Sequence, residues 1–322
     1  MKLLFVVHRY GFPGGSEIYV QSMAEDASRR GHQVCVFAGQ HKGDMNNVSV
    51  SNNSAILHHD WDLIIVHGGD VAVQDYVLAN AAVIKSPILY LLILPSNSKL
   101  CLQALADCNW IGCSTEEDWE HCYANNVAHK AVSVRHGINW QTCLGNTGFK
   151  QKYGITGKMF LSCGGYWPNK AMHELATVFD IANVKDATLV TTGYDNRMNL
   201  MPMPTPNIMP LLLEDRSEML SALHDADCLL MHSYSEGFGL VLLEAMLNQT
   251  PWIARNIAGA KLLKQYGQTY STDGELIYRL RTFNREDFNI RAAYDHVCNN
   301  HMIWNTVDDI ERVAIESARN RY

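Results

Sequence analysis

Short apolar runs alternate with longer amphipathic or polar stretches through the first part of the chain. The runs are nearly continuous, which is typical of strands buried on both faces of a parallel sheet, and the stretches between them predict covering helices. One such helix is expected to start at the N-cap Ser16 and to end at about Arg30. The expected strands are Leu3–Val7, Gln33–Ala38, Asp62–Val66, Ile88–Leu94, Trp110–Cys113 and Ala131–Val134.

The alternation stops at residues 141–158, a polar, glycine-rich stretch that predicts a linker, and then begins again. In the second part, the proline-rich residues 201–210 predict an extended loop. The expected strands there are Met159–Cys163, Thr188–Thr192, Cys228–His232 and Trp252–Ala254, and the expected helices are Lys170–Ile181, Ser217–Ala226, Leu240–Leu247 and an amphipathic helix at about 303–319.

This pattern predicts an α/β protein of two doubly wound, Rossmann-like domains that face each other across a cleft. We expect the first domain at residues 1–145 and the second at 146–302. Ligands of such folds bind at the carboxyl ends of the strands, so the cleft between the domains is the expected site.

Composition narrows the class of protein. Of 322 residues, 47% are apolar and 18% charged, enough for packed cores and too little charge for disorder. With 26 basic and 33 acidic residues, the net charge is −7, which argues against a general nucleic-acid or membrane binder. Nine scattered cysteines without a C-x-x-C pair are expected to be reduced thiols. The apolar runs are too short for a signal peptide or a membrane span, which predicts a cytoplasmic protein.

The stretch HSYSEGFGLVLLEAM, residues 232–246, places two carboxylates around a glycine-rich turn. The turn leads from a strand into a helix, whose start offers free N–H groups and a positive dipole end to a phosphate. Glu236 stands in the turn, and Glu244 follows about two helical turns later. Carboxylates bind hydroxyl groups strongly, so the arrangement suits a nucleotide sugar. The alternative is that Glu236 caps the turn and Glu244 pairs with a lysine or arginine.

This stretch resembles the E-x7-E signature of retaining glycosyltransferases of the GT-B fold, in the large family four. Three further segments resemble that family in the same order: residues 14–17 (Gly-Gly-Ser-Glu), residues 135–139 (Arg-His-Gly-Ile-Asn) and residues 164–170 (Gly-Gly-Tyr-Trp-Pro-Asn-Lys). The resemblance covers most of the chain and is strongest at about 159–260. It implies the GT-B fold, with the C-terminal helix, about 303–322, packed back on the first domain.

The resemblance also implies roles for the matching residues. Glu244 would bind the ribose hydroxyls of the donor nucleotide, and Glu236 would bind hydroxyls of its sugar. Lys170 would neutralise the phosphates as the leaving group gains charge. The other residues implied at the donor phosphates and nucleotide are Gly237, Phe238, Gly239, Leu240, Gly14, Gly15 and Gly164.

Two positions depart from the family pattern. Gly165 stands where the family has an arginine beside the phosphates. Arg9, Arg135 and Arg255 are the candidates to replace that cation. The family's histidine near the reacting carbon is also missing from its expected strand, and His67, at the end of another strand, is the candidate catalytic substitute.

We therefore expect a retaining hexosyl- or pentosyltransferase that moves a sugar from a UDP- or GDP-sugar to an acceptor hydroxyl on a cell-surface polysaccharide or lipid-linked glycan. No metal is expected, because the D-x-D sequences at 60–62 and 225–227 precede strands, where Asp is a common turn residue. The alternatives are transfer to a hydroxymethylated base in DNA, a sugar-nucleotide epimerase or phosphorylase, and a non-catalytic, glycosyltransferase-like binding protein. A basic face for DNA would consist of Lys261, Lys264, Arg279, Arg281, Arg285 and Arg291.

Overall fold

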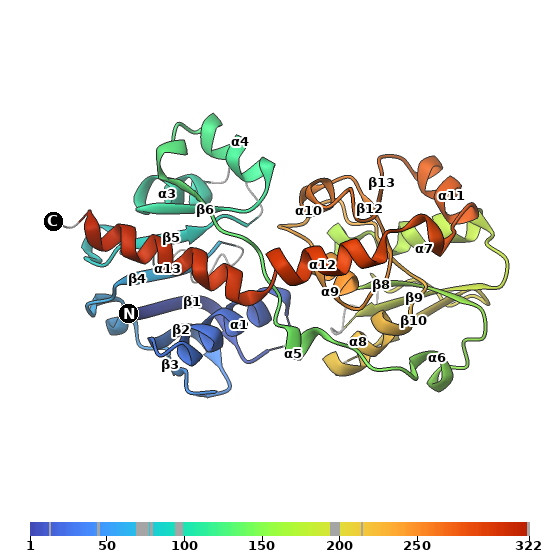
Figure 1. Ribbon diagram of the computed structural model, residues 1–322, viewed down its shortest axis with the longest axis horizontal. Coiled ribbons are helices and arrows are strands. Elements are labelled where there is room, and N and C mark those ends of the chain that lie inside the picture. The colour runs from blue at the N-terminus through green and yellow to red at the C-terminus, as the bar shows by residue number, and fades with distance from the viewer. Residues whose placement is uncertain are drawn as a thin grey trace. The chain divides into compact units, whose positions relative to one another are not determined.

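The computed structural model describes residues 1–12, 14–43, 46–68, 77, 80–93, 99–193, 200–213 and 215–320. The chain divides into two compact units, one formed by Met1–Asn139 with Asn300–Tyr322 and the other by Trp140–Asn299 (Figure 1). The first unit is thus discontinuous in sequence, whereas the second is one uninterrupted segment. None of the described helices is long and apolar enough to cross a membrane.

The described part of the first unit contains a seven-stranded parallel sheet, in the order β3-β2-β1-β4-β5-β6-β7. The chain starts inside the sheet and winds first to one edge and then to the other, as in a doubly wound fold. The winding reverses between β1 and β4, so the switch point lies there. The strands are β1 (Lys2–Tyr10), β2 (Gln33–His41), β3 (Ser49–Ser51), β4 (Leu63–His67), β5 (Ile88–Leu91), β6 (Trp110–Cys113) and β7 (Ala131–Ser133).

The second unit repeats this arrangement. Its described residues form six parallel strands in the order β10-β9-β8-β11-β12-β13, with the switch point between β8 and β11. The two predicted Rossmann-like folds are therefore confirmed. The strands are β8 (Lys158–Cys163), β9 (Ala187–Gly193), β10 (Ile208–Leu212), β11 (Cys228–Met231), β12 (Trp252–Arg255) and β13 (Gln268–Tyr270).

Helices connect the strands of both units (Figure 1). Those of the first unit are α1 (Gly15–Arg29), α3 (Lys99–Asp107), α4 (Glu116–Ala124) and α13 (Ile303–Arg319), with short 3-10 helices η1 (Ser54–His58), η2 (Ala81–Val83) and η3 (Ala128–Lys130). Those of the second are α5 (Trp140–Cys143), α6 (Phe149–Lys152), η4 (Pro168–Lys170), α7 (Met172–Ala182), α8 (Arg216–Asp225), α9 (Leu240–Leu247), α10 (Ala258–Leu262), α11 (Asp273–Arg281), η6 (Arg285–Asp287) and α12 (Ile290–Asn300).

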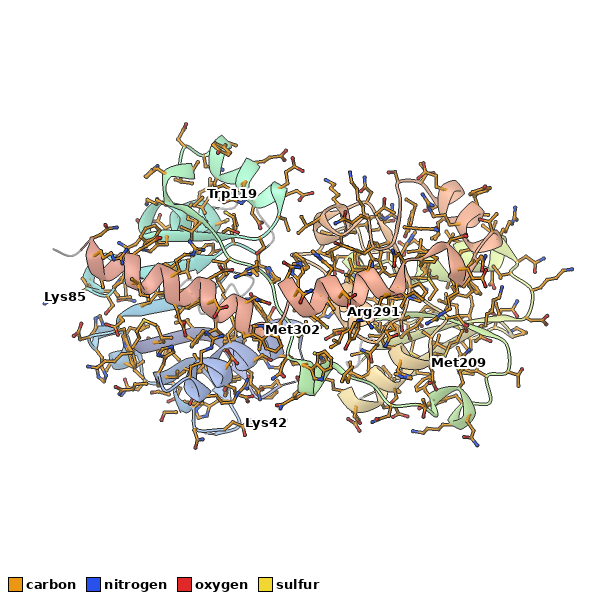
Figure 2. All side chains as sticks on the ribbon, in the orientation of Figure 1. Lys42, Lys85, Trp119, Met209, Arg291 and Met302 are labelled. Atoms are coloured by element: carbon orange, nitrogen blue, oxygen red, sulfur yellow. The ribbon has the colours of Figure 1, made fainter. Side chains whose placement is uncertain are left out.

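Each unit has its own apolar core, built on its central strands, while polar side chains project outward (Figure 2). The central strands are nearly continuous in apolar residues because both faces of a doubly wound sheet are covered. This is why the apolar runs predicted these strands well. Core residues from central strands include Leu4, Ile64, Tyr90 and Ile111 in the first unit and Phe160, Leu189, Leu230 and Ile253 in the second.

Helix α13 is attached to the first unit by polar and apolar contacts. Asp309 accepts hydrogen bonds from the backbone N–H of Arg135 at 3.0 Å and from its Nε at 2.8 Å. Asp308 pairs with Arg30 at 2.7 Å. Ile310, on the same helix, is fully buried. The last segment of the chain therefore completes a unit that the first segment began.

Two predicted irregular segments are wrong in part. Residues 141–158, the predicted linker, contain α6 and the end of α5, and Phe149 is buried against the second unit. Cys143 and Ile155 of the same polar stretch are buried as well. Within the predicted loop 201–210, residues from Ile208 onward form β10, an edge strand that tolerates Pro210 because one side of it needs no ladder partner.

Smaller differences occur at element ends. The N-cap of α1 is Gly14, and Ser16 lies inside the helix, so the predicted serine cap is wrong. Strand β5 ends at Leu91, earlier than expected, and Leu94 lies outside the described residues. The helix predicted at 303–319 has the bounds of α13.

Candidate active site

The switch point of the second unit brings two loops together. One follows β8 and runs from Gly164 to Lys170, and the other follows β11 and leads into α9. Asn169 joins the loops by hydrogen bonds: the backbone N–H of Tyr234 donates to the Asn169 carbonyl at 2.7 Å, and Asn169 Nδ2 donates to the Ser235 carbonyl at 3.1 Å. Segments about 66 residues apart in sequence therefore form one surface at the carboxyl ends of the strands.

The turn before α9 is shaped by its glycines and by one buried ring. Gly239, the N-cap of α9, has a φ of 88°, a left-handed conformation that favours glycine, and no side chain caps this helix start among the described residues. Phe238 is 3% exposed and anchors the turn, with its carbonyl accepting from Gly259 N–H at 3.1 Å. Gly237 and Leu240 flank Phe238 and Gly239 in sequence. These four predicted residues form the turn and the first residue of α9, where backbone N–H groups have no side-chain cap from the described residues.

Glu236 and Lys170 meet at this surface. Lys170 Nζ lies 2.6 Å from Glu236 Oε1, and Ser233 Oγ donates to the same oxygen at 2.6 Å. Gly164 has a φ of 144°, and a Cβ there would lie 3.5 Å from the Lys170 side chain. Both charged groups are largely shielded, with 23% of the Lys170 side chain and 11% of the Glu236 side chain exposed. Three residues predicted for the site are thus brought together.

Glu244 is buried on α9 and pairs with Arg216. Its Oε1 lies 2.5 Å from Arg216 Nη2, and only 7% of the residue is exposed. Burial alone would lower the pKa of Arg216, but Glu244 and Cys143 beside it raise that pKa above its usual value, so the guanidinium stays charged. This ion pair is the alternative arrangement considered for Glu244 from sequence.

Sequence reasoning missed Arg216. It is the first residue of α8, just after the N-cap Asp215, and lies 28 positions before its partner. No motif marks it, because the pairing depends on how α8 packs against α9. The only available signal was the apolar surroundings of Glu244, which require a buried cation or hydroxyl group.

The other predicted residues belong to the first unit. Gly14 and Gly15 form the start of α1, and a side chain on Gly14 would collide with the Glu17 carboxylate. His67 ends β4 at the switch point and is 3% exposed, with its ring centroid 6.1 Å from that of Tyr19 in an edge-to-face arrangement. Burial lowers the pKa of His67 to about 4, so its imidazole is neutral near pH 7.

The three candidate replacement cations have different surroundings. Arg135 pairs with Asp309 in the first unit, and Arg9 lies over the Phe12 ring at 4.1 Å. Arg255 is the one in the second unit, next to the turn: its Nη2 lies 3.0 Å from His232 Nε2, and its guanidinium is 4.8 Å from the Tyr234 ring centroid.

The structure around Gly165 leaves no room for the arginine that the family has at this position. The Trp167 indole lies against Gly165, and a Cβ added there would overlap its Nε1. The backbone N–H of Trp167 also donates to the Gly165 carbonyl at 2.8 Å, which closes a tight turn. Trp167 therefore fills the space in which any side chain at this position would begin.

The acidic D-x-D sequences have structural partners. Asp227 accepts from Lys150 Nζ at 2.6 Å and from the Met159 N–H at 2.8 Å, and Asp225 accepts from the Gly148 N–H at 3.0 Å. Asp62 accepts from the Lys2 N–H at 2.7 Å. Across the described residues, no group of three or more His, Cys, Asp or Glu is placed to hold a metal ion.

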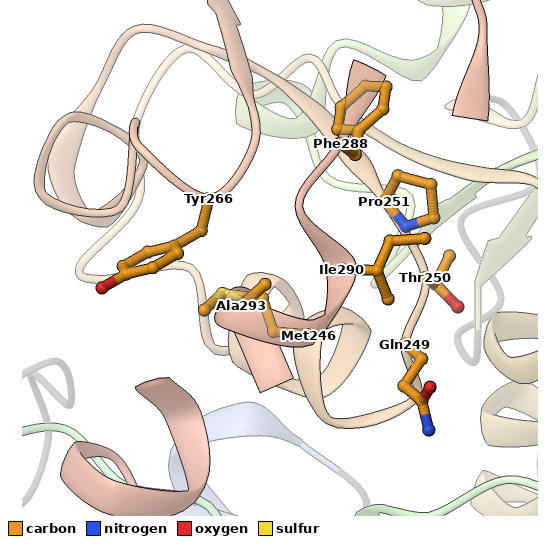
Figure 3. Close-up of a pocket in the computed structure, with 8 residues that line it drawn as sticks. All are labelled: Met246, Gln249, Thr250, Pro251, Tyr266, Phe288, Ile290 and Ala293. Carbon is orange, nitrogen blue, oxygen red and sulfur yellow. The ribbon is translucent and has the colours of Figure 1, made fainter. Parts of the chain in front are cut away.

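A crevice in the second unit lies away from the turn. It adjoins the C-terminal end of α9, whereas the turn precedes the N-terminal end, and its lining is mostly apolar (Figure 3). It therefore belongs to the contact between α9 and the following segments. Its lining residues are Met246, Gln249, Thr250, Pro251, Tyr266, Phe288, Ile290 and Ala293.

Comparison with known proteins agrees with this geometry. Residues 157–278 match the family model described as "Glycosyl transferases group 1". No curated protein matches the sequence. The match contains both loops of the switch point and all of α9. Most of the second unit thus matches the group 1 glycosyl transferase model, in agreement with the resemblance seen in the sequence.

Solved structures agree over nearly the whole chain. HepE from Anabaena, in complex with UDP-glucose, matches with a TM-score of 0.78 at 16% identity, over 98% of this chain and 100% of that one. Sucrose-phosphate synthase from Thermosynechococcus elongatus matches with a TM-score of 0.76 at 14% identity, over 98% of each chain. A structure described as trehalose-6-phosphate from E. coli bound with UDP-2-fluoro glucose matches with a TM-score of 0.73 at 13% identity, over 98% and 99%. At these identities the likeness is one of fold, namely the GT-B fold of glycosyltransferases.

Proposed function

We propose, from its glycosyl transferase group 1 domain, that the protein is a retaining glycosyltransferase that uses a nucleoside diphosphate sugar and needs no metal ion. The observation that carries the proposal is the pair of carboxylates around the α9 turn, each held by a cation: Glu236 by Lys170 and Glu244 by Arg216. Between them, the uncapped start of α9 offers N–H groups to a pyrophosphate. The matched structures that contain UDP or UDP-sugars make a uridine nucleotide the first candidate.

In the proposed complex, Glu244 accepts hydrogen bonds from the ribose hydroxyls and Glu236 from hydroxyls of the sugar. Gly237, Phe238, Gly239 and Leu240 present backbone N–H groups to the pyrophosphate. Lys170 has three N–H donors, so it can keep its bond to Glu236 and still reach a phosphate oxygen. The cation then stabilises the charge that grows on the leaving phosphate, an electrostatic effect worth roughly 3 kcal/mol for a well-placed donor.

The proposed reaction is a front-face displacement. The bond between the anomeric carbon and the phosphate oxygen breaks, the acceptor oxygen bonds to the same face of that carbon, and the acceptor proton passes to the leaving phosphate. A nucleoside diphosphate and a glycoside with unchanged anomeric configuration result. No protein nucleophile is required, and neutral His67, Gly14 and Gly15 are proposed to contribute from the first unit, toward the sugar and the acceptor.

For the acceptor, we propose a hydroxyl of a cell-surface polysaccharide or lipid-linked glycan. Four of the six basic residues considered for a DNA-binding face already bind neighbours in their own unit. Arg281 Nε donates to the Ala182 carbonyl at 3.1 Å, and Arg285 donates to the Gln249 carbonyl at 2.7 Å. Arg279 Nη1 donates to the Gln268 side chain at 3.2 Å. Arg291 forms an ion pair with Asp295 at 2.9 Å. Their engagement favours the glycan over DNA.

The test begins with the donor. Thermal shift and calorimetry of the full chain with UDP, GDP, ADP and their sugar derivatives, with and without EDTA, should show one preferred nucleotide and no effect of the chelator. Glu244→Ala should weaken that binding roughly tenfold or more, because a hydrogen bond to a charged group is lost. NMR of the product should then show retention at the anomeric carbon. Failure of every nucleotide to bind, or an inverted product, would refute the proposal.

A further inference from the structure

The carboxylate of Glu244 is engaged on one side. Both hydrogen bonds recorded to it end on Oε1, from Arg216 Nη2 at 2.5 Å and from Cys143 Sγ at 3.9 Å. Among the described residues, the structure records no hydrogen bond to Oε2. A carboxylate can accept at both oxygens, so one is committed to the protein and the other remains for a ligand.

Arg216 starts α8 and is held by contacts with α5 and α9. Its own backbone starts α8, where Asp215 caps the helix by accepting from the Ser217 N–H at 2.8 Å. Its Nη2 also lies 3.3 Å from Cys143 Sγ, at the end of α5. Burial raises the pKa of the Cys143 thiol to about 11, so this group stays protonated and can donate to Glu244 while accepting from Arg216.

Asn248 ties the same segments together. Its Nδ2 donates to the Cys143 carbonyl at 2.7 Å and to the Glu244 carbonyl at 2.8 Å, and its Oδ1 accepts from the Gly145 N–H at 2.8 Å. The end of α5 and the end of α9 are therefore held at one spacing. That spacing fixes the position of Cys143 relative to Glu244. The Arg216 guanidinium, which contacts both side chains, is therefore held in a defined position.

We propose that Arg216 is a positioning residue that occupies Oε1 of Glu244 and so presents Oε2 to the ribose diol of a nucleoside diphosphate. The inference rests on the proposed function, in which Glu244 binds the ribose. Arg216 is proposed to act through Glu244, because its Nη2 bonds to both the carboxylate and the Cys143 sulfur, while its Nε is buried and has no hydrogen-bond partner among the described residues. Without the guanidinium, a buried carboxylate would lose its compensating charge and its fixed orientation.

The test separates the ribose from the rest of the nucleotide. Calorimetry on the full chain gives the Kd for UDP and for 2′,3′-dideoxy-UDP, or for the GDP pair if guanine is the preferred base. The wild type should prefer the natural nucleotide by roughly 10- to 100-fold, the range expected for hydrogen bonds to a charged group. Arg216→Met should reduce that preference to about threefold or less, while the affinity for the dideoxy nucleotide changes little.

The matched control is Lys150→Met, which removes a similarly shielded cation from the Lys150–Asp227 pair of the same unit, 2.6 Å apart, and should leave the preference unchanged. Arg216→Lys keeps the charge without the planar fork and should give an intermediate preference, which decides the matter if Arg216→Met does not fold. The positioning role would be overturned if Arg216→Met lost the same factor of affinity for the natural and the dideoxy nucleotide. It would also be overturned if Arg216→Lys kept the full wild-type preference for the natural nucleotide.

Failure of the proposed function gives a different result. If the wild type binds no nucleoside diphosphate, or binds the natural and dideoxy forms equally, then Glu244 does not bind a ribose and the inference falls with the proposed function. If the wild type discriminates and Glu244→Gln loses the discrimination while Arg216→Met keeps it, only the role of Arg216 is refuted.

Discussion

Lys170 and Arg216 each neutralise a carboxylate beside the α9 turn, but the two cations have different freedom. The Lys170 ammonium ends a flexible stem and carries three donors, so it can turn between Glu236 and a phosphate. The Arg216 guanidinium is planar and is held by both Glu244 and Cys143. In the proposed function, Lys170 can thus follow the charge that moves to the leaving phosphate, whereas Arg216 keeps the Glu244 carboxylate in one orientation.

This difference gives a kinetic prediction. Lys170→Ala should lower kcat by roughly 10²- to 10³-fold, because the lost charge acts mainly on the leaving phosphate, while the Kd for UDP changes much less. Steady-state kinetics together with calorimetry measure the two effects. Lys158→Ala, an exposed lysine in the same unit, is the control and should keep wild-type values. Full turnover in Lys170→Ala would remove this residue from the reaction.

A second residue-scale prediction concerns acid. His67 is buried with its pKa lowered from 6.5 to about 4, so between these values the unfolded chain binds a proton that the folded chain excludes. The free energy of unfolding should therefore fall as pH drops from 6.5 toward 4, with about 1.4 kcal/mol per pH unit contributed by this side chain.

Denaturant unfolding of wild type and His67→Gln at pH 7, 6 and 5 measures that contribution. The variant should lose less stability over this range than the wild type does. The exposed His58, in the same unit, provides the control substitution His58→Gln, which should follow the wild-type curve. Parallel curves for wild type and His67→Gln would show that His67 is not responsible for the acid sensitivity.

At the scale of elements, the start of α9 depends on one backbone conformation. Gly239→Ala should lower the free energy of unfolding by roughly 1–2 kcal/mol, because φ is 88° and a Cβ would press on Met231 Sδ at 3.1 Å. It should also weaken UDP binding, since the turn that presents the N–H groups must shift. Thermal melts and calorimetry measure both. Gly274→Ala, in the first turn of α11 without a positive φ, is the matched control and should be neutral or slightly stabilising.

Elements buried on both faces were predictable, and those at the edges were not. Leu229 and Ile253 lie in short central strands whose apolar runs have few alternatives to a covered sheet. Ser49–Ser51 forms β3 at an edge, where polar residues suffice because only one neighbour pairs with it. The proximity of Glu236 and Lys170 could be predicted, because each residue belongs to a sequence motif and both motifs lie at the same switch point. Arg216 did not, because its contact is set by the docking of α8 against α9, which no local pattern records.

On the scale of the whole molecule, the two units differ in continuity. The fragment 140–299 contains the complete six-stranded sheet of the second unit as one segment, so it should fold alone and give a cooperative melt. The fragment 1–139 lacks α13 and should fail to do so. Circular dichroism melts of the two fragments test this. A cooperative melt of 1–139 equal to that of the first unit in the full chain would show that α13 is dispensable.

The return of the chain to its first unit also sets an order of events during synthesis. Residues 1–139 leave the ribosome well before α13, the helix that packs on α1, because the whole second unit is translated between them. The second unit can therefore finish folding while the first still exposes an apolar face, and that face is a target for chaperones until α13 has been synthesised. A premature stop just before α13 would consequently produce a chain with a folded second unit and an incomplete first unit, a product suited to degradation rather than to partial activity.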